Sequence, residues 1–374
     1  MQRERRISGF ALPNPRDQTS LLRSLWQSLA FQSVHFANGN PRNSLQLNDM
    51  KILNRYTFVP SAANAGSMPQ RSAMNRRFLR PAATLAFVCF LAVLPAATQS
   101  SPNQSPGQPQ VQSGFAEING DKLYYEAAGS GHALVLIHGG QMDSRMWDEQ
   151  FALFSKSYRV IRYDVRGFGK SPASTNVYAD EDDLASLLKY LHAGKAYVVG
   201  LSLGGRIAID FALTHPDMAD AIIPVAPGLS GFRFSDDANQ MESWRAALAG
   251  DWQKVAGLWL KSGYMAPAME NPKIVSRLRQ LALENAHEYL DNPVLESMPD
   301  PPAIDRLPEI KVPTLIIVGN RDVADIHEIC GLLYARIPHA REILIENSGH
   351  IVNMEQPELF NRSVLDFLAG LPKQ

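Results

Sequence analysis

From about residue 115 onward, short apolar runs alternate with longer amphipathic segments. The apolar runs lack a polar residue at every second position, which is typical of strands buried on both faces of a parallel sheet. Strands that alternate with helices predict an α/β fold with a doubly wound, mostly parallel sheet. The predicted strands are 115–118, 122–127, 133–137, 158–163, 196–199, 221–226, 314–318 and 342–345, and the predicted helices are 146–155, 180–192, 203–213, 326–336 and 357–368.

Two features modify this alternation. Asn119-Gly120 separates the first two strands, and this dipeptide favours the positive φ angles of a tight hairpin turn. The interval 228–311 has helical patterns but no strand signal, so we expect an inserted helical lid at about 229–305. Its large apolar residues have enough surface to wall a pocket, although packing between lid and core is the simpler role for any one of them. They are Trp244, Trp252, Trp259, Tyr264, Met265 and Met269.

The first hundred residues follow a different pattern. A basic stretch from Met74, an apolar run at 82–97 and small residues after it have the three parts of a secretory signal, so we assign 74–98 to a signal peptide or an N-terminal membrane anchor. The run is short for a transmembrane helix. Residues 1–73 are expected to be disordered, or an over-extended reading frame whose true start is Met68 or Met74 instead of Met1. Residues 99–113 are rich in Pro, Gln and Ser and predict a flexible linker to a folded domain at 114–372.

These segments predict export to the periplasm or the medium, or anchoring through residues 82–97 if the signal is not cleaved. Charge follows the same division, because residues 1–100 carry 12 basic and 3 acidic residues, against 24 and 34 in residues 101–374. An acidic folded part lacks the basic face that nucleic acid requires, which excludes that partner. The folded part holds a single thiol, Cys330, to which we assign no role.

The strongest chemical motif is Gly-Leu-Ser-Leu-Gly-Gly at 200–205, between a predicted strand and a predicted helix. A serine on such a strained turn projects its hydroxyl outward, and glycines are needed where side chains would collide with backbone. The helix N-terminus adds partial positive charge and free N–H groups. We therefore predict Ser202 as the nucleophile and the backbone N–H of Leu203 as one oxyanion donor.

The second oxyanion donor is expected from His138-Gly139-Gly140, at the end of an earlier strand. We predict the backbone N–H of Gly140 for this role, and a structural role for the side chain of His138.

A serine needs a base, and an acid that orients the base. His350 lies in a loop between the last predicted strand and the last helix, where it can reach over the sheet, so we predict it as the base. Asp322 follows the strand at 314–318 and is the predicted acid, with Asp325 as the fallback. Asp217 and Asp220 are poor alternatives because they precede their strand.

The chain order Ser202, Asp322, His350, together with LVLIHGG, RVIRYDVRGFGKS and the closing SGHIVNMEQPELFNRSVLDFL, resembles the α/β-hydrolase superfamily over residues 114–372. SRMWDEQ followed by RYDVRGFGKS is similar to its small-molecule esterases and enol-lactonase-like enzymes, which have a helical lid and no cofactor. The resemblance implies the same triad and oxyanion residues. It also implies structural roles for Asp164, Arg166, Gly167 and Gly169. Serine at the nucleophile position disfavours a haloalkane dehalogenase.

We therefore expect a serine hydrolase that cleaves a small ester or lactone through an acyl-enzyme, with no cofactor and no metal. A cofactor-free C–C hydrolase or peroxidase and a non-catalytic ligand-binding protein stay open, because fold and triad do not determine the substrate. An aminopeptidase-like enzyme also stays open. In it, acidic lid residues would hold a substrate amine, although a solvated helix face explains them more simply. These residues are Glu242, Glu270, Glu284 and Glu288.

Overall fold

The computed structural model describes residues 110–235, 239–288 and 295–372. The chain divides into two units, residues 1–105 and 106–374, and every described residue belongs to the second. The predicted N-terminal extension, signal and most of the linker lie outside the described residues, so they stay predictions. Within the described part, no helix is long and apolar enough to cross a membrane.

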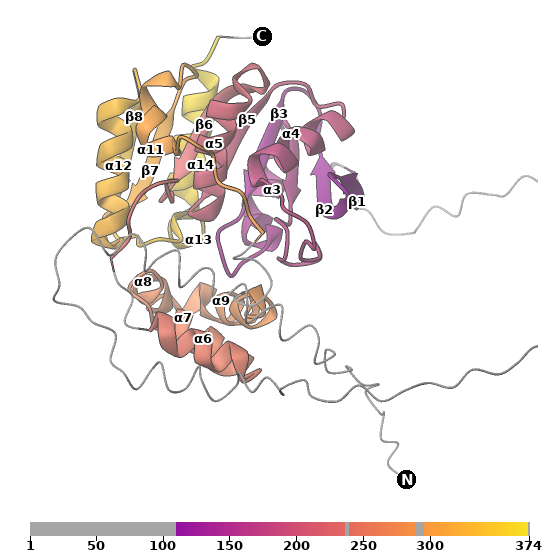
Figure 1. Cartoon of the computed structure of the whole chain (residues 1–374). Helices are drawn as coiled ribbons and strands as arrows, with labels where there is room; N and C mark the ends of the chain where they lie inside the picture. The colour runs from indigo at the N-terminus through magenta and orange to yellow at the C-terminus, as the bar shows by residue number, and fades with distance from the viewer. Residues whose placement is uncertain (1–109, 236–238, 289–294, 373–374) are drawn as a thin grey trace, which may run out of the picture. The chain divides into compact units, whose positions relative to one another are not determined.

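An eight-stranded sheet forms the centre of the second unit (Figure 1), in the order β1-β2-β4-β3-β5-β6-β7-β8. β2 pairs antiparallel with both of its neighbours, and all pairs from β4 to β8 are parallel, which confirms the predicted mostly parallel sheet. Each predicted strand is present, and the first begins at Gln112, one residue before the predicted end of the linker. The strands are β1 (Gln112–Ile118), β2 (Asp121–Ala128), β3 (Ala133–Ile137), β4 (Arg159–Tyr163), β5 (Ala196–Leu201), β6 (Ala219–Val225), β7 (Leu315–Gly319) and β8 (Arg341–Ile345).

Two hydrophobic cores cover the two faces of this sheet. Alternate residues of β3 enter different cores, Leu134 and Leu136 the one and Val135 and Ile137 the other, which explains why the strand is apolar throughout. The predicted helices are confirmed. One core packs against α4 (Asp180–Tyr190), α5 (Leu203–Thr214) and α12 (Ala324–Arg336), and the other against α3 (Asp148–Phe154) and α14 (Pro357–Ala369).

Short elements complete the domain. The predicted hairpin turn is confirmed, with φ angles of 48° at Asn119 and 87° at Gly120. The remaining short helices are η1 (Ser144–Trp147), η2 (Pro216–Met218), α11 (Ala303–Arg306), η3 (Leu307–Glu309) and α13 (Val352–Glu355).

A helical insert separates β6 from β7, in the interval where a lid is predicted. It contains α6 (Gln240–Leu248), α7 (Trp252–Trp259), α8 (Ala266–Met269) and α9 (Pro272–Glu284) (Figure 1). The helical character of the interval is therefore confirmed. Its opening and closing as a lid stays a prediction.

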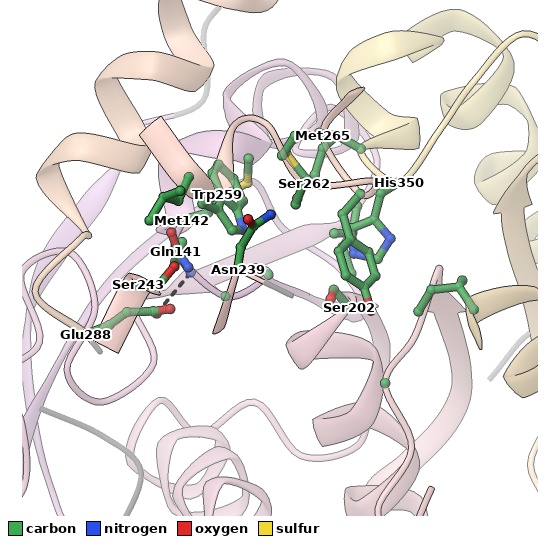
Figure 2. Close-up of a pocket in the computed structure, with 18 of the residues that line it drawn as sticks. Gln141, Met142, Ser202, Asn239, Ser243, Trp259, Ser262, Met265, Glu288 and His350 are labelled. Carbon is green, nitrogen blue, oxygen red and sulfur yellow. Dashed lines mark hydrogen bonds between the residues drawn. The ribbon is translucent and has the colours of Figure 1, made fainter. Parts of the chain in front are cut away.

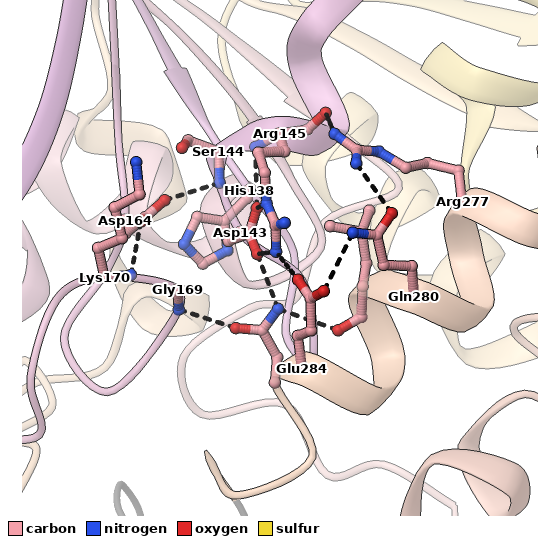
Figure 3. Close-up of polar contacts among 12 residues, drawn as sticks. His138, Asp143, Ser144, Arg145, Asp164, Gly169, Lys170, Arg277, Gln280 and Glu284 are labelled. Carbon is pink, nitrogen blue, oxygen red and sulfur yellow. Dashed lines mark hydrogen bonds and ion pairs between the residues drawn. The ribbon is translucent and has the colours of Figure 1, made fainter. Parts of the chain in front are cut away.

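Polar contacts fasten the end of α9 to the loop after β3 (Figure 3). The buried side chain of Asn285 donates to Asp143 at 2.9 Å and accepts the N–H of Gly169 at 2.8 Å. Arg145 joins the same group by pairing with both Asp143 and Glu284. Burial alone would raise the pKa of Asp143, but hydrogen bonds from Arg145 and Asn285 lower it to about 2. Asp143 is therefore ionised throughout the pH range in which proteins are normally folded.

Arg166 is a buried cation in the loop after β4. Its guanidinium contacts the carboxylates of Asp121 and Asp183 and donates to the carbonyl oxygen of Ile118 at 3.0 Å. In the same loop, Asp164 accepts the N–H groups of Ser144 and Lys170. These contacts join the loop to the hairpin, to α4 and to the loop after β3, in agreement with the structural roles that the family resemblance implies.

We predict a large loss of stability when Arg166 is removed. Arg166→Ala is expected to lower the free energy of unfolding by about 3–5 kcal/mol, because buried carboxylates lose their partner. Lys122→Ala is the control. It breaks an ion pair with Glu117 in which both side chains are more than half exposed, and should cost less than about 1 kcal/mol. Urea denaturation followed by circular dichroism measures both, and equal losses would contradict the structural role of Arg166.

Candidate active site

Ser202 occupies a strained turn between β5 and α5. Its backbone has φ 54° and ψ −108°, a conformation that residues with a side chain rarely adopt. The surrounding backbone leaves no room for side chains. A Cβ on Gly200 would lie 1.9 Å from the carbonyl oxygen of Gly204, and one on Gly204 would lie 2.3 Å from that of Ile137. The glycines on either side of Ser202 are therefore a packing requirement of this turn.

The turn opens into a cavity of about 320 Å³. Strand-end residues, including Gly140, Ser202 and His350, line one part of it, and the insert supplies Trp259 and Met265 among others. Figure 2 shows Ser202 and His350 at the same side of this cavity. The insert also contacts the histidine directly, because the ring of Tyr264 meets the ring of His350 edge-on at 5.0 Å between centroids.

His350 and Asp322 form a buried pair. Nδ1 of His350 lies 2.9 Å from one carboxylate oxygen of Asp322 and 3.2 Å from the other. The side chain of Asp322 is fully buried and that of His350 is 5% exposed. The described part of the chain has no hydrogen bond between Ser202 and His350, although both side chains face the same cavity. Catalytic hydrogen bonds of this kind often tighten only when substrate binds.

The other aspartates have different partners. Asp325, the fallback acid, contacts a segment that is far away in the sequence. Its carboxylate accepts hydrogen bonds from the N–H and from the hydroxyl of Ser235, both at 2.8 Å. Asp220 pairs with His132 and Lys195. Asp322 is therefore the aspartate in contact with His350.

Glu355 holds the loop that carries His350. Its carboxylate accepts the N–H of Gly349 at 2.9 Å and that of Ile351 at 3.0 Å, the two residues on either side of the histidine. Burial raises the pKa of Glu355, and hydrogen bonds from these two N–H groups oppose the rise. Glu355 is not among the residues predicted from the sequence. A glutamate five positions after a candidate base, at the end of a short helix, is the signal that was available.

Two backbone N–H groups near Ser202 have no hydrogen-bond partner within the described ranges 110–235, 239–288 and 295–372. Those of Leu203 and Gly140 form no hydrogen bond among the described residues, whereas those of their neighbours Gly139, Gln141 and Gly204 are all engaged. Leu203 is the first residue of α5, so the positive end of the helix dipole reinforces its donor. The groups that remain available are the two that the sequence analysis predicts for an oxyanion.

His138 has a different environment from His350. Its Nδ1 donates to the carbonyl oxygen of Gly139 at 2.8 Å, and its Nε2 accepts the N–H of Val165 at 2.9 Å, so the ring is neutral. Burial lowers the pKa of His138, which keeps it uncharged. The side chain thus holds the loop after β3, as predicted, and both of its nitrogens are occupied.

Arg206, one turn into α5, sits in a buried acidic cluster. It pairs with Asp180 at 2.9 Å, with Asp210 at 3.2 Å and with Glu296. Burial raises the pKa of Asp180 well above its ordinary value, with a further contribution from the charge of Glu296. Burial likewise raises the pKa of Glu181 to about 7, and one oxygen of that carboxylate has no partner among the described residues.

Other candidate chemistry is absent from the described residues. They contain no group of three or more His, Cys, Asp or Glu side chains arranged to hold a metal ion. Cys330 is buried in a hydrophobic core, and burial raises the pKa of its thiol. A thiol in that state is a poor nucleophile.

Comparison with known proteins identifies the family of the chain. The model of the alpha/beta hydrolase family matches residues 134–363. Among curated proteins, a 2-hydroxy-6-oxononadienedioate/2-hydroxy-6-oxononatrienedioate hydrolase of Burkholderia vietnamiensis is 29% identical over 66% of the chain and 91% of its own length. The 3-oxoadipate enol-lactonase 2 of Acinetobacter baylyi is 28% identical over 65% and 91%. Among solved structures, the enol-lactonase of Burkholderia xenovorans superposes with a TM-score of 0.59 at 27% identity, covering 68% of this chain and all of its own.

The raised pKa of Glu181 predicts a pH-dependent stability. The folded state favours the protonated carboxyl, so its contribution is complete below the ordinary value of 4.5 and is lost as the pH rises towards 7. Glu181→Gln cannot ionise at this position. As the pH rises from 5 to 8, its free energy of unfolding should therefore increase by about 2 kcal/mol relative to that of the wild type. Urea denaturation at the two pH values measures this gain. The exposed Glu328→Gln is the control, and the same gain in both variants would contradict the assignment.

Proposed function

The chain belongs to the alpha/beta hydrolase family, and from its site we propose that it is a serine hydrolase that cleaves a small ester or lactone through an acyl-enzyme, with Ser202 as the nucleophile. The observation that carries the proposal is the common cavity. Four separate segments meet at one place and supply Ser202 on its strained turn, the buried His350–Asp322 pair and two N–H groups that have no partner among the described residues. Nucleophile, base, orienting acid and oxyanion donors are the parts that acyl transfer requires.

The first half-reaction forms the acyl-enzyme. The Ser202 oxygen attacks the substrate carbonyl carbon, and Nε2 of His350 takes the hydroxyl proton. The N–H groups of Gly140 and Leu203 donate to the oxyanion that develops on the carbonyl oxygen. Asp322 stays ionised and stabilises the imidazolium through Nδ1. His350 then gives its proton to the leaving alcohol oxygen as the carbon–oxygen bond breaks.

The second half-reaction releases the acyl group. His350 takes a proton from a water molecule, whose oxygen attacks the acyl carbon. The same oxyanion donors stabilise the second tetrahedral intermediate, and Ser202 leaves with the proton returned by His350. In a lactone the leaving oxygen stays attached to the acyl chain, so the product is a hydroxy acid.

Other reactions of this fold are separable by experiment. A C–C hydrolase would cleave a carbon–carbon bond next to a ketone, and a cofactor-free peroxidase would consume peroxide. A binding protein would retain ligand without turnover. The insert as a moving lid, and export or anchoring through residues 82–97, are further proposals that rest on the sequence pattern alone.

The proposed triad predicts graded losses of rate. Ser202→Ala should reduce hydrolysis of aryl esters of increasing acyl length to the background rate, because the variant lacks the hydroxyl that attacks the carbonyl carbon. Asp322→Asn should lower kcat by about 10,000-fold, because an amide stabilises the wrong histidine tautomer. Asp325→Asn is the matched control and should retain the wild-type kcat. A similar loss in the two aspartate variants would contradict the choice of Asp322.

Glu355 is expected to affect kcat through the position of His350. Glu355→Gln keeps the shape but has a single acceptor oxygen in place of two, so one of the two loop N–H bonds is lost. We expect kcat to fall by about 10-fold with KM nearly unchanged. This loss corresponds to the free energy that about one hydrogen bond contributes to holding His350 in position. Glu358→Gln, exposed on the neighbouring helix, is the control. A normal kcat in Glu355→Gln would contradict the positioning role.

A further inference from the structure

The part of the insert between α7 and α9 contacts both of the loops that carry the proposed base and acid. It runs from Ser262 to Glu270 and includes α8, and we name it the bracket segment. Met265 and Ala268 are buried in the core that also packs against α3 and α14. By contrast, α6 and α7 supply most of the buried residues of a small separate core. The bracket segment is therefore packed on the body of the domain.

The bracket segment contacts the loop that carries Asp322 at two places. A Cβ on Gly263 would lie 3.0 Å from Cγ1 of Val323, the residue that follows Asp322. At the other end of the segment, each carboxylate oxygen of Glu270 accepts a hydrogen bond of 2.9 Å from the guanidinium of Arg321, the residue that precedes Asp322. Both chain neighbours of the proposed acid therefore lie against the insert.

The same segment contacts the loop that carries His350, also at two places. A Cβ on Gly349 would lie 2.7 Å from Cγ of Pro267, so the proline ring sits directly against the backbone before the histidine. The rings of Tyr264 and His350 lie 5.0 Å apart between centroids, with their planes inclined by 65°. Separations of about 4.5–7 Å and steep angles are favourable for aromatic pairs. Tyr264 is therefore in attractive contact with the proposed base itself.

His350 needs a restraint that leaves its Nε2 available. The torsion that turns a histidine ring is broad, so the hydrogen bond from Nδ1 to Asp322 fixes one ring atom better than it fixes the tilt of the ring. A hydrogen bond at Nε2 would restrain the tilt, but it would occupy the atom that has to take the proton of Ser202. Contact with a second ring restrains the tilt by packing and requires neither nitrogen.

We propose that Tyr264 is a positioning residue, whose ring holds the His350 ring in the orientation that lets Nε2 take the proton of Ser202. The inference rests on the proposed serine hydrolase function. The bracket segment fixes Tyr264 in turn, because it is packed on the domain and contacts both loops of the base–acid pair. The insert is then part of the catalytic framework as well as a wall of the cavity.

Substitutions at Tyr264 separate the ring from the hydroxyl. Tyr264→Leu and Tyr264→Met remove the ring, and each should lower kcat for aryl esters by about 10-fold, near the upper end of what one aromatic pair contributes. KM should stay nearly unchanged, because the effect acts through His350. Tyr264→Phe keeps the ring and should retain nearly the wild-type kcat. Circular dichroism and urea denaturation establish which variants are folded.

A second measurement reports on the base without an ester substrate. The rate constant for the reaction of Ser202 with a small fluorophosphonate depends on proton removal by His350. It should fall in Tyr264→Leu by about the same factor as kcat, whereas a merely structural role would leave it unchanged in the folded variant. Trp252→Leu is the matched control, since Trp252 packs against the small separate core of the insert. This control should keep both the wild-type kcat and the wild-type labelling rate.

The outcomes separate this inference from the proposed function. A wild-type kcat in both non-aromatic variants, or a raised KM with unchanged kcat, overturns the inference and leaves the serine hydrolase intact. An equal loss in Tyr264→Phe or in Trp252→Leu overturns the assignment to the ring of Tyr264, and so does unfolding of both non-aromatic variants. If the wild type hydrolyses no aryl ester and its Ser202 does not react with the fluorophosphonate, the proposed function itself fails, and the inference with it.

Discussion

The close approach of backbone around Ser202 is the constraint on which the site depends. The carbonyl oxygen of Gly204 lies where a Cβ of Gly200 would be, so the strand and the helix pack together only through glycines. This contact forces Ser202 into a conformation with positive φ and directs its side chain into the cavity. It also leaves the first N–H of α5, directly beside the serine, without a partner in the part of the chain that the structure describes. The position of the nucleophile and the availability of the oxyanion donor thus both follow from one packing contact.

The rest of the proposed machinery is held by buried polar contacts at the carboxyl ends of neighbouring strands. Asp322 follows β7 and His350 follows β8, and because these strands are parallel neighbours their following loops meet. Glu355 then holds both backbone neighbours of the histidine. Each group is positioned by a second contact that does not itself face the cavity, which gives the site the preorganisation that acyl transfer needs.

Local patterns made the sheet and the triad candidates predictable. Apolar runs mark buried strands, and the glycine spacing marks the turn at Ser202, because both signals lie within a few adjacent residues. The choice of Asp322 over Asp325 followed from position after a strand. The role of Glu355 was missed although its partners lie only four and six positions away, because the sequence does not show that the loop of His350 folds back onto the following helix. The hydrogen bond from the N–H of Gln141 to Glu288 could not be predicted, since the two residues lie 147 positions apart.

The central claim is that Ser202 carries the acyl group during turnover, and mass spectrometry of the acid-quenched protein tests it most directly. Wild-type protein mixed with a slowly deacylating aryl ester should gain the mass of the acyl group, and peptide mapping should find that mass on Ser202. Acyl mass on another residue, or rapid turnover with no acylated protein and no burst of released phenol, would contradict the account.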